Sequence, residues 1–579
     1  MNSLSNTKAF YRLTILLIIC IGVARIVSTY RVFNQTVDES SNIACGMQLL
    51  QDRDYYMDVK HPPLARISAA LGLYLEGARL PGPGYGDDRF GLGNVILNDG
   101  NRYWHHLTLS RLGTLPFFVL GCLVVWFWSY RISGQWAALF SLLFFSLLPS
   151  ILAHSGVATN DMAGAATLCL ALYCLTSWIE NPTWWAAARL GVATGLALVS
   201  KFSALLFLPG CAAALILLCF AAGANPVRNR PIGKIACQAA MCLVVAYFVL
   251  WAGYLFTLAP IQASRPHAGI DRAVGSHGMV HDALSAIVET PVPAGRIVAG
   301  VAALAGQNKA GQVSFFLGEW RRHGWWYFFP VMFLVKTPVA FLLFSLIGSV
   351  FLLRTFRQDR DWRRIAPIVF ALVILALSMS SHIDVGSRHI LAIYPLLSIV
   401  IGTFAWEFWN STRRPMVYRS AVLAGLASLA ISSVLAHPDY LAYFNFLASD
   451  RPERIEVDSD LDWGQDLARL SKWLRARGMR DVALAYFGTV DLTHAGLPPF
   501  HELVPYQKVS GWVAISARYR VIPSPYVVLP QPPGMAAYYS IPGNFDGIKP
   551  GDGPFAWLMD YKPVEKIGKS IFVYYIPPQ

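Results

Sequence analysis

The chain alternates between long apolar runs and short polar connections over most of its length. A bilayer core of about 30 Å takes about 20 apolar helical residues to cross. The pattern therefore predicts about eleven transmembrane helices, near 13–30, 108–130, 135–152, 163–179, 184–200, 203–222, 236–258, 327–353, 364–381, 389–409 and 417–436. The first run lacks a small-x-small cleavage site and is followed by Arg25 and Arg31, so we interpret it as a retained span rather than a signal peptide.

The remaining segments predict two long loops and a terminal domain. Residues 1–436 are expected to form a membrane module with outer loops at 31–107 and 259–326, and residues 437–579 a separate small α/β domain. Asp462 and Gln465 have the spacing of a capping box, and Leu467, Leu470 and Leu474 then follow on one helical stripe. Runs at 482–487, 526–529 and 571–575 predict strands.

Composition agrees with a membrane protein. Charged residues are 14% of the chain and hydrophobic residues 55%, whereas soluble domains average roughly 25% charged residues. The 33 Phe, 18 Trp and 25 Tyr also exclude a disordered chain. Eight of the nine cysteines lie in or beside apolar runs and the other, Cys45, is in a polar loop, so neither a disulfide framework nor a cysteine metal site is indicated.

The formal charge of +13 is unevenly distributed over the loops, and this distribution orients the chain. Cytoplasmic loops carry an excess of Lys and Arg. One side receives nearly all of these residues: Lys8, Arg12, Arg131, Arg228, Arg230, Lys234, Arg354, Arg357, Arg360, Arg363, Arg364, Arg413, Arg414 and Arg419. We therefore expect a multi-pass protein, in a bacterial inner or plasma membrane, with a cytoplasmic N-terminus and an extracytoplasmic C-terminus. The charge indicates topology and no nucleic-acid partner.

A second set of ionisable residues lies on the opposite side, beside the predicted spans. Asp38 and Glu39 follow the first span, and Asp161 precedes the fourth. Four cations fall on the same side: Arg111, Lys201, Lys336 and Arg388. Ionisable groups at such places are costly and usually functional. A pocket of carboxylates and cations suits a lipid-linked phosphate attacked by a hydroxyl, because cations stabilise a leaving phosphate and a carboxylate accepts the proton.

Each residue also has a purely structural interpretation. Asp38 and Glu39, or Asp161, are alternatively helix caps, and Arg111 and Lys201 are alternatively snorkelling to headgroups. In the structural interpretation of Lys336, the nearby prolines open its helix to water. The histidines His61 and His154 are more typically structural and hydrogen-bonded. The functional interpretation rests on the convergence of these residues on one side.

The motifs resemble those of the protein O-mannosyltransferases and, more broadly, the GT-C superfamily of polyprenyl-phosphate-sugar-dependent glycosyltransferases, family 39. The resemblance lies in the acidic pair 38–39 and in the segments 58–64, 158–161, 200–204, 324–338, 388–391 and 461–467, which read DVKHPPL, ATND, SKFSA, GWWYFFPVMFLVKTP, RHIL and LDWGQDL. It spans nearly all of the membrane part and the start of the outer domain. It implies an α-helical, GT-C-like polytopic fold with a C-terminal extracytoplasmic α/β domain.

The resemblance also implies an activity and residue roles. The enzyme would transfer a sugar, with inversion, from a polyprenyl-phosphate donor to a hydroxyl of a protein, lipid or glycan acceptor at the outer face. Asp38 would be the catalytic base, and Glu39 and Asp161 would position the acceptor, the sugar or a divalent cation. Arg111, Lys201, Arg388 and Lys336 would hold the donor phosphate. The acceptor or the donor would be positioned by His61, His389 and Asp462.

This chain differs from the family motifs at two places, so the resemblance does not identify the acceptor or the cofactor. Eukaryotic mannosyltransferases continue His-Pro-Pro with Gly-Lys and carry inserted β-trefoil repeats, whereas this chain has Ala65-Arg66 and a short middle loop. Aminoarabinose transferases have Glu-Lys-Pro where this chain has Lys60-His61-Pro62, so a divalent cation is only an option, and His61 as a ligand an alternative. A lipid-sugar flippase or transporter and a non-catalytic cell-envelope assembly protein remain alternative functions, although no inverted repeat is visible.

Overall fold

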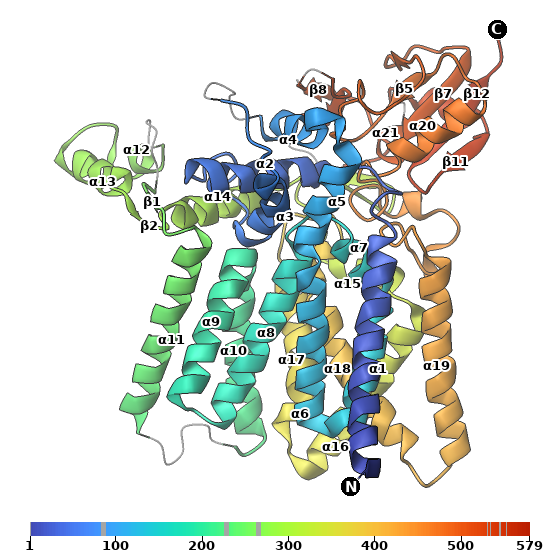
Figure 1. Ribbon diagram of the computed structural model, residues 1–579. Helices are drawn as coiled ribbons and strands as arrows, with labels where there is room; N and C mark the ends of the chain where they lie inside the picture. Colours follow the sequence, from blue (N-terminus) through green and yellow to red (C-terminus); the bar gives the residue numbers. More distant parts are fainter. Residues whose placement is uncertain are drawn as a thin grey trace.

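A computed structural model describes residues 2–82, 88–224, 231–261, 268–529, 531–532, 534–543, 546–551 and 553–578. Roughly parallel helices form the lower layer of the molecule, shorter helices lie across their upper ends, and a region rich in β-strands caps one side (Figure 1). The N-terminus lies at the lower end of the bundle and the C-terminus in the upper cap. Of the residues used to orient the chain, Arg228, Arg230 and the side chain of Lys8 lie outside the described residues.

Each predicted span contains a helix. These helices are α1 (Asn2–Val27), α5 (Tyr103–Thr114), α6 (Pro116–Ser146), α7 (Pro149–Ser155), α8 (Asp161–Glu180), α9 (Trp184–Ser200), α10 (Ala204–Ala221), α11 (Ile232–Gly253), α15 (Phe328–Lys336), α16 (Val339–Asp359), α17 (Trp362–Ser378), α18 (Ile393–Trp409) and α19 (Pro415–Leu435). The run 327–353 is divided between α15 and α16, because Pro338 has no backbone N–H to continue a helix.

Among the described residues, seven helices are long and apolar enough to cross a membrane. One of the seven is the stretch Tyr103–Ser146, which has 44 residues. Gly134 within this stretch has the non-helical dihedral angles φ 85° and ψ −175°. The Ser141 hydroxyl donates to Ser129 Oγ at 2.8 Å, so α6 folds back on itself at this glycine. Helices α9, α17 and α18 have 17 residues each. The protein is thus polytopic, and a total of eleven crossings stays a prediction.

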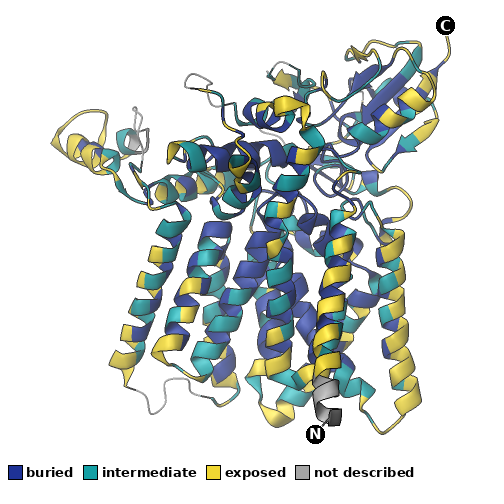
Figure 2. Cartoon of the chain, in the orientation of Figure 1, coloured by how far each residue is buried: buried dark blue, intermediate teal, exposed yellow. Residues whose placement is uncertain are grey.

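The bundle has a buried centre, and its outer helices carry many exposed residues (Figure 2). Helix α18 is buried over most of its length, and it packs between α6, α16 and α17. The outer helices α1, α11 and α19 instead expose large apolar side chains, including Leu13, Leu16, Leu17, Leu243, Val244, Phe248, Leu423, Ile431 and Val434. An apolar surface of this extent suits contact with lipid tails.

The connections at the lower end share ion pairs and hydrogen bonds. Arg131, in the α6 turn, pairs with Glu180 at the end of α8, and Arg363 lies 3.6 Å from the same carboxylate. Arg360 donates to the carbonyl of Ala221 at the end of α10 at 3.0 Å. Basic residues from distant parts of the sequence therefore gather at one end of the bundle, as the loop pattern predicts.

The two long loops fold into helices at the upper end. The first contains α2 (Val37–Asp52), α3 (Leu64–Leu75) and α4 (Arg89–Asn98), and the middle loop contains α12 (Ala268–Val274), α13 (Met279–Glu289), α14 (Arg296–Ala310) and the strands β1 (Leu258–Ala259), β2 (Val292–Pro293), β3 (Ser314–Phe316) and β4 (Glu319–Arg321). Helices α2 and α3 pack on each other over the bundle (Figure 1).

The C-terminal region is built on a five-stranded mixed sheet in the order β11-β12-β7-β5-β6. Its strands are β5 (Ala483–Ala485), β6 (His501–Glu502), β7 (Gly511–Ser516), β11 (Glu565–Ile567) and β12 (Ile571–Ile576), and β5 is parallel to both neighbours. Two short strands, β8 (Val527–Leu529) and β9 (Tyr538–Ser540), pair separately. The hairpin β3–β4 pairs with β10 (Asp546–Ile548), so the middle loop contributes to this region, and Phe315 and Trp320 share its core.

The predicted strands all contain observed strands, but the predicted helix start is wrong. Helix α20 (Leu467–Ala476) buries Leu467, Leu470 and Leu474, as the stripe predicts. It begins four residues later than a capping box at Asp462 requires, with Asp466 at the N-cap. The Asp462 carboxylate instead accepts the N–H of Gly464 at 3.3 Å within its own turn.

Candidate active site

Four charged side chains from distant segments form one connected cluster at the upper end of the bundle. Arg388 donates through Nη1 to Asp38 Oδ2 at 2.7 Å, and the same nitrogen lies 3.9 Å from Asp161 Oδ2. Lys201 donates through Nζ to Asp161 Oδ1 at 2.7 Å. The sequence separates Asp38 and Arg388 by most of the chain, yet the fold alternates two carboxylates with two cations in a single row.

The local structure explains why the carboxylates occupy these places. Asp38 lies in the first turn of α2, and Asp161 is the first residue of α8. Helix N-termini carry partial positive charge, which favours a carboxylate there. Lys201 follows the end of α9 and passes Gly164 of α8 so closely that a Cβ on this glycine would lie 2.9 Å from Lys201 Cβ. The glycine thus leaves room for the lysine to reach Asp161.

The members of this cluster differ in their access to solvent. The Asp38 side chain is 38% exposed, whereas those of Arg388, Lys201 and Asp161 are 14%, 16% and 2% exposed. In the described part of the chain, the Asp38 carboxylate has no hydrogen-bond partner besides Arg388. Arg388 keeps a buried Nε without a partner. Asp38 is therefore the accessible carboxylate of the cluster, and Arg388 retains hydrogen-bonding capacity.

Arg111 and Glu39 lie beside the cluster but are fully used in holding the backbone. All five N–H groups of Arg111 are occupied: two by the Glu39 carboxylate, each at 2.8 Å, and the others by the carbonyls of Tyr30, Phe33 and Asn34. Glu39 also caps α2 by accepting the N–H of Thr36 at 2.8 Å. Both side chains are at most 1% exposed. This geometry leaves no donor on Arg111 for a phosphate, contrary to the role expected for it, and no access to Glu39.

Lys336 and Asp462 are also buried and hydrogen-bonded to other parts of the protein. Lys336 donates to the carbonyls of Leu441 at 2.6 Å and Asp460 at 2.8 Å, and its side chain is 2% exposed. Asp462 accepts from the N–H groups of Gly464 and Arg518 and is fully buried; burial raises its pKa to about 8. Lys336 therefore ties the C-terminal region to the end of α15, and Asp462 holds a turn inside the C-terminal region, which differs from the phosphate-binding and positioning roles expected for them.

The histidines near the cluster also differ in their exposure to solvent. His61 is half exposed, and its Nδ1 lies 3.4 Å from the Asn160 amide, next to Asp161. His389 and His154 each have a buried ring nitrogen without a partner among the described residues, Nε2 and Nδ1 respectively. His61 remains suited to contact a substrate at the rim of the cluster. The described residues contain no group of three His, Cys, Asp or Glu side chains arranged to hold a metal ion.

One member of the site was not among the residues singled out from the sequence. Trp463 packs its ring beneath the Arg388 guanidinium, with the Arg388 Cζ 4.5 Å from the ring centroid. Its edge also meets the ring of His154. The only signal in the sequence was the segment 461–467, which resembles a family motif without indicating which side chain it places near the charges.

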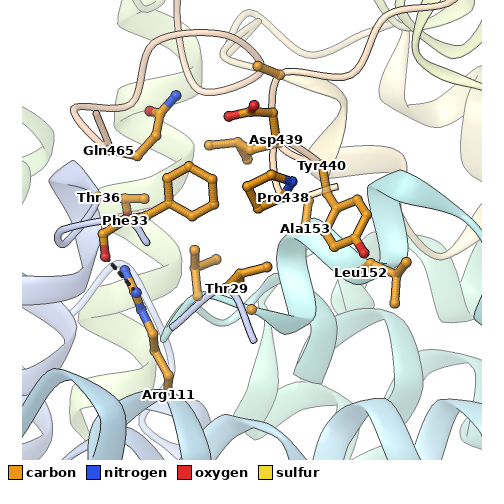
Figure 3. Close-up of a pocket in the computed structure, with 14 residues that line it drawn as sticks. Thr29, Phe33, Thr36, Arg111, Leu152, Ala153, Pro438, Asp439, Tyr440 and Gln465 are labelled. Atoms are coloured by element: carbon orange, nitrogen blue, oxygen red, sulfur yellow. Dashed lines mark hydrogen bonds between the residues drawn. The ribbon is translucent and has the colours of Figure 1, made fainter. Parts of the chain in front are cut away.

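A small cavity lies beside Arg111, and neither Asp38 nor Arg388 is among the residues that line it (Figure 3). It is lined by residues such as Thr29, Phe33, Leu152 and Tyr440, and Arg111 forms part of its wall. Its volume of about 30 Å³ is room for little more than a water molecule. It is therefore too small for a sugar.

Comparison with known proteins relates the chain to glycosyltransferases. Residues 106–252 match the family described as dolichyl-phosphate-mannose-protein mannosyltransferase. No curated protein sequence matches the chain. The S. cerevisiae protein O-mannosyltransferase Pmt1–Pmt2 complex bound to the sugar donor is similar in structure, with a TM-score of 0.51 and 12% identity over 74% of this chain and 90% of that one. At such identity the similarity shows the fold alone.

ArnT from Cupriavidus metallidurans is more distant in structure, although the aligned length is greater. Its apo state aligns over 97% of this chain and 99% of that one, with 11% identity and a TM-score of 0.46. ArnT bound to undecaprenyl phosphate aligns over 76% of this chain and 67% of that one, with 15% identity and a TM-score of 0.45. The chain is thus a multi-pass membrane protein whose residues 106–252 match the dolichyl-phosphate-mannose-protein mannosyltransferase family and whose fold is similar to that of the yeast Pmt1–Pmt2 complex.

Proposed function

We propose that this protein transfers a sugar from a polyprenyl-phosphate-linked donor to an acceptor hydroxyl on the extracytoplasmic face of the membrane, with inversion at the anomeric carbon. The observation that carries the proposal is the row Asp38–Arg388–Asp161–Lys201, in which the accessible carboxylate of Asp38 pairs with Arg388 and the buried carboxylate of Asp161 links Arg388 to Lys201. The family match of residues 106–252 supports a phosphate-linked donor.

In the proposed reaction Asp38 accepts the proton of the acceptor hydroxyl while that oxygen forms a bond to the anomeric carbon. The bond from the anomeric carbon to the phosphate oxygen breaks, and the phosphate leaves with the electron pair. Arg388 and Lys201 stabilise its charge. Attack on the face opposite the leaving group inverts the configuration. A phosphate of low pKa leaves without a proton, so the site requires no general acid.

Arg388 is the residue that changes partner in this reaction. In the unliganded arrangement it donates to Asp38, which neutralises the base. A donor phosphate is a better bidentate partner for a guanidinium than a single carboxylate oxygen. We expect donor binding to draw Arg388 from Asp38 and so to release the base. Asp161, held by Lys201 and by Thr159 Oγ1 at 3.1 Å, keeps the two cations in place.

The optional divalent cation has little support from the donor set. Asp161 and Asp38 each face a cation, and His61 is the accessible nitrogen near them. The described side chains therefore do not fit a metal site, and no step is derived through one. The polyprenyl tail would lie along the apolar helix faces exposed to lipid. The acceptor would enter from the exposed side of Asp38.

The orientation is part of the proposal. Arg131, Arg360 and Arg363 lie at the end of the bundle that holds the N-terminus, and the cluster lies at the opposite end. Because cytoplasmic loops carry the excess of Lys and Arg, the cluster is assigned to the extracytoplasmic face. Labelling single cysteines at 410–414 and at 446–450 with a membrane-impermeant reagent in intact cells checks this, with only the latter expected to react.

The test of the function is a transfer assay with purified protein and a panel of labelled polyprenyl-phosphate sugars. We expect one donor to be consumed and Asp38→Asn to abolish consumption while the protein still inserts and folds. Asp54→Asn is the matched control, because Asp54 is similarly exposed, 37%, and pairs with Arg296 at 3.1 Å on the same side. Unchanged turnover in Asp38→Asn would remove the base assignment. Movement of labelled lipid across liposomes without consumption would instead favour a flippase.

A further inference from the structure

We propose that the loop 459–466, and Trp463 above all, is a positioning element of the active site that sets Arg388 against Asp38. This inference rests on the proposed function, since it concerns how the phosphate-binding cation and the base are held. It gives the C-terminal region a part in transfer.

Trp463 packs the face of its ring against the guanidinium group of Arg388. Its ring is 2% exposed and faces the guanidinium, with a distance of 4.5 Å from Arg388 Cζ to the ring centroid. A desolvated cation over the face of a tryptophan is the strongest form of the cation–π contact. When a donor phosphate draws Arg388 from Asp38, the contact with Trp463 persists. The tryptophan thus fixes the plane in which the guanidinium meets the phosphate.

The same loop is attached to the backbone on both sides of the pair. On the Arg388 side, Ser387 donates to the Asp460 carboxylate through its N–H at 2.6 Å and its hydroxyl at 2.9 Å. On the Asp38 side, the N–H of Val37 donates to the Trp463 carbonyl at 3.0 Å. The residue directly before each member of the pair is therefore bonded to one short loop, which fixes the distance between base and cation.

Two further features show that the loop is built for close approach. Gly386 has φ 116°, and a Cβ at this position would lie 2.3 Å from Ser459 Oγ. Lys336 donates to the Asp460 carbonyl at 2.8 Å, which anchors the loop to the end of α15. The buried cation that the sequence suggests as a phosphate ligand thus acts through Asp460 on the segment that carries Arg388.

The experiment compares Trp463→Leu, Trp463→Phe and the matched control Trp473→Leu in the full-length protein. Trp473, in α20, carries its own cation–π contact, with Arg477 Cζ 4.1 Å from its ring centroid, and packs next to Trp512. We expect Trp463→Leu to raise the donor KM about 10- to 30-fold, the range that loss of a desolvated cation–π contact predicts. Trp463→Phe should restore most of the affinity, and Trp473→Leu should leave KM and kcat unchanged.

A double-mutant cycle separates positioning from a general effect on folding. If Trp463 acts through Arg388, Trp463→Leu adds little to the defect of Arg388→Ala, because the group that it positions is already absent. If the two defects multiply, or if Trp463→Leu lowers kcat and thermal stability without changing the donor KM, the inference is overturned. An active Arg388→Ala variant with unchanged donor KM would contradict the proposed function itself. The outcomes for the two proposals are thus distinguishable.

Discussion

Arg111 and Arg388 should respond in opposite ways to the same substitution, arginine to lysine. At Arg111, lysine keeps the charge but has three N–H donors in place of the five that are all used. At least two hydrogen bonds to buried acceptors are lost, including one arm of the bidentate contact with Glu39. Each bond to a charged group contributes about 1.5–3 kcal/mol. We expect a loss of about 3–5 kcal/mol, in the range for disruption of a buried ion pair.

At Arg388 the cost to stability should be small and the cost to binding large. Its single hydrogen bond to Asp38 is one that a lysine ammonium can reproduce, and its side chain is 14% exposed. A lysine cannot, however, bind a phosphate bidentately or lie flat against Trp463. We expect a donor KM raised about tenfold, with a smaller loss in the free energy of unfolding than at Arg111, because only one hydrogen bond is involved.

The assay is thermal unfolding in detergent, with donor KM measured on the same preparations. Arg111→Lys should lower the apparent unfolding temperature sharply and keep the donor KM of whatever fraction stays folded, whereas Arg388→Lys should do the reverse. If Arg111→Lys remains as stable as the parent and loses donor affinity, then the saturated geometry of Arg111 does not describe its role. The phosphate-binding role expected from sequence would then hold for it.

Three further predictions follow from single contacts. Gly164→Ala should displace Lys201, because the Lys201 Cβ would lie 2.9 Å from the added methyl group, and we expect the donor KM to rise several-fold. Gly306→Ala is the control in the same transfer assay and should have no effect, because a methyl group at Gly306 in α14 would have nothing within 4 Å. Lys201→Met should lower transfer by about 100-fold, as removal of one stabilising group does elsewhere, while Lys201→Arg should retain part of it; equal activity of the methionine variant would exclude Lys201 from phosphate binding. Burial raises the pKa of Asp384 to about 7 from an unfolded value near 3.9, so the folded protein binds the extra proton and stability should fall as pH rises from about 4 to 7. Asp384→Asn, which can still accept the N–H of Trp325, should flatten this dependence of the unfolding temperature, and an unchanged pH profile would contradict the assignment.

The stripe of α20 shows where prediction from sequence succeeds and where it fails. Leu467, Leu470 and Leu474 are buried as expected, because helical periodicity depends only on neighbouring residues. The start of the helix was placed wrongly because the Asp462 carboxylate turns to Gly464 and Arg518, and Arg518 is distant in sequence. The predicted capping box competed with a tertiary contact that spacing alone does not reveal.

For the charged residues too, prediction from sequence succeeds in part and fails in part. That Asp38, Asp161, Lys201 and Arg388 share one end of the bundle follows from counting spans, and the structure brings the four together. Sequence treated Arg111 and Lys336 as equivalent to these cations. Their donors are consumed by backbone carbonyls of 30–34, 441 and 460, which only the folded chain brings within reach.

The sequence by itself determined that this is a helical membrane protein, which side of the bundle holds the charges and which family its motifs resemble. Those properties depend on local apolar runs, on charge in loops and on short motifs, all of which are linear in the chain. Only the tertiary structure decided which cations keep free donors, because that depends on which carbonyls and carboxylates converge on each one. It also placed Trp463 against Arg388, since packing joins surfaces that the sequence lists far apart.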